Sequence, residues 1–344
     1  MAATWESPRV PSGEGTTAAQ CGACHTEIYA EWKASIHAHA WTDAQFQREL
    51  AKDPEVGWLC LNCHTPATDQ QAELIGYEGD VRGVERTKNP AFSTAWRDEG
   101  LTCVGCHWRP EGIAGPYGGT TAPHPVVHDP TLLESSACTS CHQAVARLED
   151  TLVCHFNTGA EWASSESEAS CQSCHMPPVT RALVEGGVER EGRRHLFLGS
   201  GIPKDAQTAQ EAEWFALLQP AVDVRVEGDA VVLTNARADH RVPTGDPERY
   251  LLVTVKARDA EGETLATTSY RIGQVWEWWP AAKQLSDNRL MPGEERRIAF
   301  EAPSGTVEVH VLVEHYRISP ENADYHGLEG YPTKRAVYEE RLAR

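Results

Sequence analysis

The sequence contains few methionines and lacks any long apolar run. Only three methionines occur among its 344 residues, so methionine side chains can supply very few metal ligands. No stretch of 18 or more consecutive apolar residues occurs, and a helix that crosses a bilayer needs about that length. Residues 1–20 are polar and do not have the pattern of a signal peptide. We therefore expect no integral membrane segment.

Positive charge is also scarce. Lysine and arginine number 31 against 50 acidic residues, and the formal net charge is −19 at pH 7. A nucleic-acid binder must neutralise phosphates with basic side chains. This balance argues against nucleic acid and anionic membrane surfaces, and it favours partners with basic surfaces.

Cysteine and histidine are abundant instead, with 11 and 15 residues. Ten of the cysteines fall into five copies of the pattern C-x-x-C-H, whereas chance would give about 0.015 copies at this composition. The copies are Cys21-Gly-Ala-Cys24-His25, Cys60-Leu-Asn-Cys63-His64, Cys103-Val-Gly-Cys106-His107, Cys138-Thr-Ser-Cys141-His142 and Cys171-Gln-Ser-Cys174-His175.

This pattern is typical of covalent haem attachment. Two thiols form thioethers with the vinyl groups of one haem, and the next residue, a histidine, binds the iron. Zinc ribbons pair two C-x-x-C units in one site, and five units that each carry histidine fit that arrangement poorly. Disulfides, a thioredoxin-like motif and iron–sulfur clusters do not require the histidine either. The sequence therefore predicts five covalently attached haem c groups, with His25, His64, His107, His142 and His175 as proximal ligands.

The motifs, together with the strand-like segments that follow them, predict an α + β protein of two domains. We expect a flexible N-terminus over 1–15, a pentahaem domain of short helices and loops over 16–210, and a charged tail over 321–344. Helices are expected over 26–50 and 134–148. Within 216–320 alternating apolar segments and turn signals predict six or seven strands, arranged as an immunoglobulin-like β-sandwich. In the haem domain the porphyrins are expected to replace an apolar side-chain core.

The sequence resembles the multihaem c-type cytochromes of the cytochrome c-552/4 group, which are related to the tetrahaem electron acceptor of hydroxylamine oxidoreductase in nitrifiers. The resemblance rests on the first motif with the following Glu31-Trp32-x-x-Ser35-x-His37, and on Cys171 to Pro177. The segment Asp239 to Gly245 resembles the start of a β-domain that many such cytochromes carry. A fifth motif and this β-domain depart from the tetrahaem pattern.

The second axial ligands are expected to be histidines, because Met176 adjoins its own proximal histidine and the chain has only two other methionines. The resemblance implies His37 and His195 as ligands. If a helix continues beyond His25, the 12 residues to His37 span about 18 Å, so His37 would serve a different haem. His124, His128 and His240 form the pool for the remaining irons, with ordinary loop or turn roles as the alternative. His310, His315 and His326 are expected on strand faces or at the surface.

Electron transfer along a row of mostly bis-histidine haems is the function that these features favour, with low to moderate potentials. The alternatives are small-molecule oxidation or reduction at one five-coordinate haem, and a subunit of an extracellular cytochrome filament formed by self-association. We therefore favour the expectation that the protein is an electron carrier over the alternative that it is an enzyme. The expected location is periplasmic or extracellular, and the expected partners are other redox proteins.

Overall fold

The structure is a computed structural model that describes residues 10–14, 16–118, 122–148, 151–204, 217 and 219–344. The chain divides into two compact units. Unit 1 comprises Met1–Cys141, Ala169–Gly199 and Pro203–Phe215, and unit 2 comprises His142–Glu168, Ser200–Ile202 and Ala216–Arg344. The N-terminal segment 1–9 and most of the region around the expected boundary at 210 lie outside the described residues.

The helices are short, and none that is described exceeds nine residues. Those in unit 1 are α1 (Ala18–Gly22), α2 (Thr26–Ala34), α3 (Ala44–Lys52), α4 (Trp58–His64), η1 (Thr68–Gln70), α5 (Thr94–Arg97), α6 (Val104–His107), η2 (Pro130–Leu133), α7 (Ser136–His142, whose last residue begins unit 2) and α9 (Cys171–His175). Each of the five motifs overlaps one of these helices, and four of the five motif histidines are the last residue of their helix, whereas Cys24 and His25 lie between α1 and α2.

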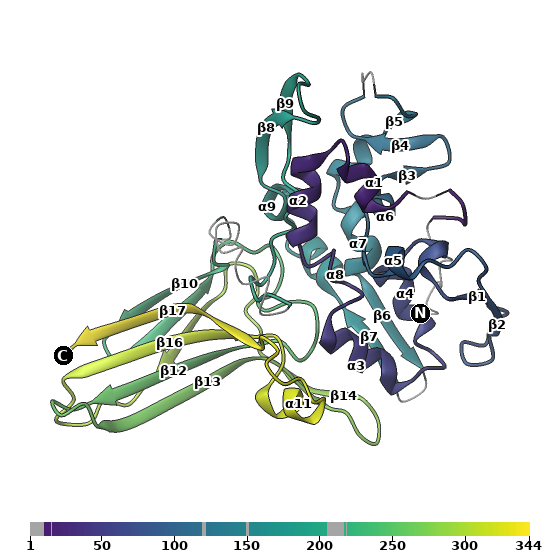
Figure 1. Ribbon diagram of the computed structural model, residues 1–344. Helices are drawn as coiled ribbons and strands as arrows, with labels where there is room; N and C mark the ends of the chain where they lie inside the picture. The colour runs from purple at the N-terminus through teal and green to yellow at the C-terminus, as the bar shows by residue number, and fades with distance from the viewer. Residues whose placement is uncertain (1–9, 15, 119–121, 149–150, 205–216, 218) are drawn as a thin grey trace. The chain divides into compact units, whose positions relative to one another are not determined.

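Small sheets connect the helices of unit 1. They are β1 (Glu73–Gly76) with β2 (Glu85–Lys88), β3 (Trp108–Arg109) with β4 (Gly112–Gly115) and β5 (Val126–His128), and β8 (Pro178–Ala182) with β9 (Glu189–Arg193). The β8–β9 hairpin lies beside α2 (Figure 1), where Arg181 of β8 forms hydrogen bonds with Glu31 of α2.

Unit 1 has little apolar core of its own. Its described clusters of buried apolar residues are small: one contains Val10, Ala67, Trp96 and Val104, and another contains Ala18, Trp32 and Ala38. Chains of this size usually bury a larger continuous core. The expectation that other groups supply apolar packing in this unit is consistent with these clusters.

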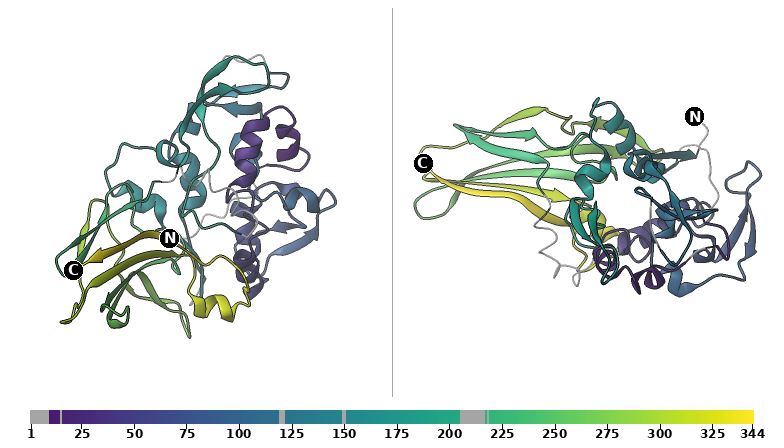
Figure 2. Two further views of the ribbon diagram at one scale, coloured as in Figure 1. Left: turned by 60° about the vertical axis from the view of Figure 1, so that its left-hand side comes forward. Right: turned by 90° about the horizontal axis from the view of Figure 1, so that it is seen from above.

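Unit 2 contains two larger antiparallel sheets. One has the order β10 (Val222–Glu227), β11 (Ala230–Asn235), β15 (Glu295–Ala299), and the other has the order β14 (Lys283–Asp287), β13 (Thr264–Glu277), β12 (Tyr250–Arg258), β16 (Glu308–Tyr316), β17 (Lys334–Ala343). Figure 2 shows the long strands of the second sheet side by side. We call residues 221–344 the two-sheet region.

One apolar cluster joins both sheets. Its fourteen buried members include Val231 and Leu233 of β11, Val253 of β12 and Val311 of β16. The buried residues of β12 and β16 alternate along their strands with more exposed ones, as strands with one buried face require, whereas β11 is buried at five of its six positions. The two-sheet region therefore has a larger conventional core than the described residues of unit 1 form.

A further segment of unit 2 carries β6 (Ala144–Leu148), β7 (Thr151–Phe156) and α8 (Thr158–Ala163). Glu161 of α8 is buried and accepts hydrogen bonds from Arg289 Nη1 and Thr244 Oγ1, each over 2.7 Å. These bonds attach α8 to the two-sheet region.

Several expectations about secondary structure were wrong. The helix expected over 26–50 is broken, because the backbone becomes extended at Ser35 after α2 and helix resumes only at Ala44. Residues 144–148 form strand β6 and not helix, since they pair with β7. The tail expected over 321–344 contains α11 (Pro320–Tyr325) and the strand β17, which pairs with β16 along its length.

Among the residues that the structure describes, none of the helices combines the length and the apolar character needed to cross a bilayer.

Candidate haem-binding sites

The two thiols of each motif are not joined as a disulfide in this structure. No disulfide links any of the eleven cysteines, including Cys154 of β7. A C-x-x-C pair joined as a disulfide could not form thioethers, so the motif cysteines have the chemical state that haem attachment needs. Within the described part of the chain, no three or more His, Cys, Asp or Glu side chains gather as a separate metal site.

Four of the motif histidines are oriented by the same kind of contact. In each of them ring nitrogen Nδ1 faces a backbone carbonyl oxygen. The pairs are His25 with Leu183 at 3.0 Å, His64 with Ala40 at 2.7 Å, His107 with Ala114 at 2.8 Å, and His175 with Leu198 at a shorter distance. A carbonyl oxygen can only accept a hydrogen bond, so Nδ1 carries the proton and the lone pair stays on Nε2. This is the tautomer that binds a metal through Nε2.

Burial keeps the imidazoles of His64 and His107 neutral. It lowers the pKa of His64 and of His107, and in both cases it outweighs the hydrogen bond to the carbonyl. The ring of Phe46 also stacks on His64, with centroids 3.7 Å apart and planes 6° apart. A neutral imidazole has the free lone pair that a metal ligand needs.

Two motif histidines face a second histidine at a distance that fits a shared iron. An imidazole nitrogen binds first-row metals at about 2.0–2.1 Å, so two rings on opposite sides of one metal have centroids about 6 to 6.5 Å apart. The His107 and His195 centroids are 6.2 Å apart, and the His25 and His124 centroids are 6.5 Å apart. The residues present fit the group that the motifs predict.

His195 is also prepared as a ligand by its own contacts. Its Nδ1 lies 3.0 Å from the carbonyl oxygen of Arg193, which again leaves the lone pair on Nε2. Burial, followed by the charge of His107, lowers the pKa of His195 to about 4. The ring is therefore neutral around pH 7.

His37 lies in a turn after α2 and not on the helix that we expected. The backbone at His37 is fixed by two hydrogen bonds to its carbonyl oxygen, from the N–H groups of Ala40 and Leu101. Gly100 approaches it closely, with φ +64° and space for no Cβ, since that atom would lie 2.8 Å from the His37 oxygen. The His37 ring packs against Phe197 with centroids 4.4 Å apart.

The other candidates have different surroundings. His128 is exposed and its Nε2 lies 3.0 Å from the carbonyl oxygen of Pro116, so that nitrogen donates a hydrogen bond in this structure. His240 is half-buried and its Nδ1 lies 2.9 Å from the carbonyl oxygen of Arg241. His310 pairs with Glu339 at 2.8 Å. His315 lies on strand β16, which is one of the two positions expected for it; its Nε2 is buried, and burial lowers its pKa to about 3.

The fold brings motifs together in pairs. The thiols of Cys21 and Cys103, the first cysteines of motifs one and three, form a hydrogen bond. The thiols of Cys138 and Cys171, the first cysteines of motifs four and five, do the same. The first cysteines of the two motifs in each pair are therefore neighbours.

Buried hydrogen bonds hold the second pair of motifs. Gln172 of α9 donates through Nε2 to the carbonyl oxygens of Leu132 and Glu134, over 2.9 and 2.7 Å. Ser135 Oγ accepts a hydrogen bond from the N–H of Cys171. The start of motif five is thus fixed against the residues before motif four.

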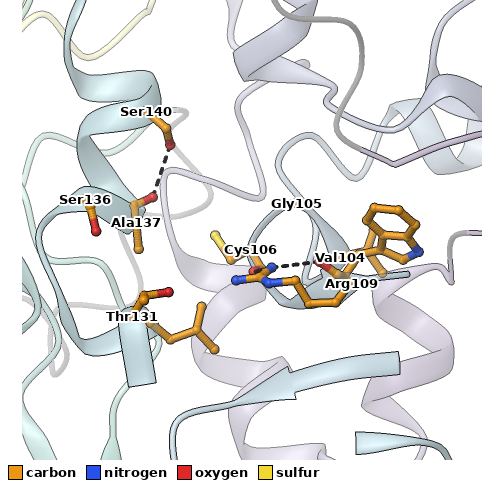
Figure 3. Close-up of a pocket in the computed structure, with 10 residues that line it drawn as sticks. Val104, Gly105, Cys106, Arg109, Thr131, Ser136, Ala137 and Ser140 are labelled. Carbon is orange, nitrogen blue, oxygen red and sulfur yellow. Dashed lines mark hydrogen bonds between the residues drawn. The ribbon is translucent and has the colours of Figure 1, made fainter. Parts of the chain in front are cut away.

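A cavity of about 320 Å³ lies at the third motif. Figure 3 shows it between Cys106 on one side and Ser136 and Ser140 of α7 on the other. Arg109 Nη1 borders it and donates to the carbonyl oxygen of Cys106 over 3.0 Å. The fold thus leaves open space beside a thiol that the sequence assigns to haem attachment.

The sequence reasoning gave no role to Glu31, Gly100 and Phe197, although each contacts a candidate ligand or its segment. The pair Glu31-Trp32 recurs as Glu161-Trp162, and both glutamates are buried beside arginines. That repeat was a usable signal for buried carboxylates. Nothing local marks Phe197.

The comparisons with known proteins agree with this chemistry. Residues 20–108 match the family model described as cytochrome c554 and c-prime. The fold is similar to that of a penta-heme cytochrome c552 from Thermochromatium tepidum, with a TM-score of 0.65, 20% sequence identity, and coverage of 96% of this chain and 99% of that one. No curated protein matches the sequence. Together with the five motifs, these findings support a multihaem c-type cytochrome with an α + β fold.

Replacement of Gly100 by alanine tests the close approach at His37. We expect Gly100→Ala to destabilise the protein by about 1–3 kcal/mol through its left-handed backbone, and to change the spectrum of one haem, because the new Cβ displaces the His37 backbone. Thermal unfolding and electron paramagnetic resonance (EPR) measure the two effects.

Gly228→Ala is the matched control, since Gly228 has φ +58° but open space around it. It should lower stability through the backbone alone and leave every haem signal unchanged. If the haem spectra of Gly100→Ala and Gly228→Ala were the same, the expectation that His37 is an iron ligand would be wrong.

Proposed function

We propose that this protein is a pentahaem c-type cytochrome that passes electrons between redox partners outside the cytoplasmic membrane. The observation that carries the proposal is the state of the motif histidines, four of which hold Nδ1 against a backbone carbonyl and leave Nε2 for a metal. An enzyme active site would need further polar groups around an open position. Electron transfer needs only fixed and closely spaced redox groups.

The chain's residues would hold each haem by two thioethers and one imidazole, and the haem would supply a reversible one-electron couple. The ten motif cysteines would form the thioethers. The contacts of Cys21 with Cys103 and of Cys138 with Cys171 support close spacing of motifs one and three and of motifs four and five. Close spacing is what fast electron transfer between neighbouring groups requires.

We further propose mostly bis-histidine coordination. His195 would share an iron with His107, and His124 would share one with His25, because their ring distances fit. His37, His128 and His240 remain the proposed pool for the other irons. Of these, His37 has the best-defined surroundings, between Gly100 and Phe197.

The location and the partners follow from the same chemistry. Haem is attached to C-x-x-C-H motifs outside the cytoplasmic membrane, so we propose a periplasmic or extracellular site of action. The net charge of −19 becomes more negative with haem propionates. A redox partner with a basic docking surface therefore suits this protein.

Haem content tests the proposal directly. Protein matured in a host that attaches haem c should have an intact mass that exceeds the polypeptide by five haems, since each motif forms two thioethers. A pyridine haemochrome assay gives the number independently. Mature protein with bound zinc, or with fewer than five haems, would contradict the proposal.

Replacement of His195 by alanine tests the second ligand of the His107 iron. We expect His195→Ala to convert one of five low-spin irons to high-spin and to raise its potential, because a donor that stabilises ferric iron is removed. EPR and a redox titration measure this. His310→Ala, on a histidine paired with Glu339, should change neither, and an unchanged His195→Ala spectrum would return His195 to a packing role.

Salt dependence tests the partner's charge. The rate of electron exchange with a basic redox protein, measured by stopped flow, should fall as ionic strength rises, because salt screens the attraction that steers encounter. A rate independent of salt would instead point to apolar docking.

A further inference from the structure

Glu31 of α2 is a buried carboxylate with an unusually complete set of donors. Its side chain is 4% exposed. Oε1 accepts from Arg181 Nη1 over 2.8 Å and from Arg194 Nη1 over 2.7 Å. Oε2 accepts from Arg181 Nη2 over 2.8 Å and from the backbone N–H of His195 over 2.8 Å. Such a bidentate pair is both strong and geometrically specific.

The carboxylate is ionised at neutral pH. Burial alone would raise the pKa of Glu31, but the hydrogen bonds from Arg181 and the His195 N–H, with the charges of both arginines, outweigh it and leave the pKa below its usual value. A buried ion is stable only when it is paired in this way, and removal of one partner is costly. The contact between Glu31 and the chain at His195 is therefore a strong one.

The segment 193–198 that Glu31 holds begins at Arg193, the last residue of β9, and has no regular secondary structure from 194 to 198. Its conformation at Phe197 is unfavourable, with φ +48° for a residue other than glycine. Such a backbone persists only when surrounding contacts enforce it. The bond from Glu31 to the His195 N–H is one of these contacts, and the packing of Phe197 on His37 is another.

This segment contacts two motif histidines in different ways. His195 presents its ring to His107. Three residues later, Leu198 accepts a hydrogen bond from His175 Nδ1 through its carbonyl oxygen, and its N–H donates to the His175 carbonyl oxygen over 3.1 Å. One short segment therefore orients the second imidazole at the third motif and the first imidazole at the fifth.

We propose that Glu31 is a positioning residue that fixes the imidazoles of His195 and His175 together through the segment 193–198. The irons bound by His107 and His175 then respond as a pair to a change at residue 31. This inference rests on the proposed function, because it concerns the ligands of two of its haems. Glu31 itself touches no iron.

The test compares Glu31→Gln with wild type in the holoprotein. The amide has nearly the same size as the carboxylate, but it carries no charge and presents an NH₂ group to the donors, so the bonds to Arg181 and the His195 N–H cannot all form. We expect one of five low-spin ferric signals to be lost or broadened and a second to shift, while the other three stay unchanged. EPR resolves the signals, and a redox titration should show the midpoints of two haems displaced.

Glu161→Gln is the matched control. Glu161 is followed by tryptophan as Glu31 is, its side chain is also 4% exposed, and it pairs with Arg289 over 2.7 Å. Its side-chain bonds lead to Thr244 and Arg289 and not to a proposed ligand. A general loss of a buried ion pair would therefore affect both variants in stability, but only Glu31→Gln should move two haem signals. Glu31→Asp, which restores the charge, should bring the spectrum back toward wild type.

Arg194→Gln provides a second variant in case Glu31→Gln does not mature. Its side chain is 34% exposed, so the substitution disturbs the interior less. It should shift the same two signals by a smaller amount. Unchanged signals in a variant with all five haems, or a change in only one haem, would overturn the inference. Failure of wild-type protein to bind five haems would instead overturn the proposed function.

Discussion

The hydrogen bond from Nδ1 of a motif histidine to a backbone carbonyl is the interaction on which the rest of unit 1 depends. It fixes the tautomer, and with it the nitrogen that can bind a metal. It also fixes the orientation of the imidazole ring, because the accepting carbonyl belongs to another segment of the chain. Each accepting residue lies in a segment of its own: Leu183 after β8, Ala40 in the turn after α2, Ala114 in β4 and Leu198 after β9. Each of these four segments therefore contributes a backbone carbonyl that orients a motif histidine.

The two units differ in how their apolar side chains are buried. The two-sheet region buries an apolar cluster formed by alternate residues of both sheets. Among its described residues, unit 1 has small clusters, one of which includes Trp32 with Tyr29, Cys103 and Phe197 packed against it. One of these clusters packs against Cys103 of the third motif, and another includes Val104 of the same motif. This is the distribution expected when large apolar cofactors supply the missing contacts.

Local patterns could be predicted from the sequence, and long-range pairings could not. The five motifs, with the histidine of each, and the strand-rich second half follow from spacing and alternation within a few residues. The break after Ala34 and the strand at residues 144–148 depend on partners that no local pattern specifies, such as β7. The same holds for Glu31, whose partners Arg181 and Arg194 follow it by 150 and 163 residues. Helix α2 ends at Ala34, before His37, so the helix gives no support for His37 as a ligand. The resemblance remains the basis of that expectation.

The glutamate–tryptophan pair shows how the same two residues acquire different roles. In α2, Trp32 donates through Nε1 to the carbonyl oxygen of Leu101, and Glu31 receives donors from the segment that carries His195. In α8, Glu161 is equally buried but receives Arg289 and Thr244 of the two-sheet region.

Both sites need a cation, because a carboxylate that leaves water is costly unless it is paired. In this acidic chain, arginines are therefore used in the interior to stabilise buried carboxylates. The role of each carboxylate then depends on which other part of the chain donates a hydrogen bond to it. At Glu31 that donor is the N–H of His195, a proposed iron ligand.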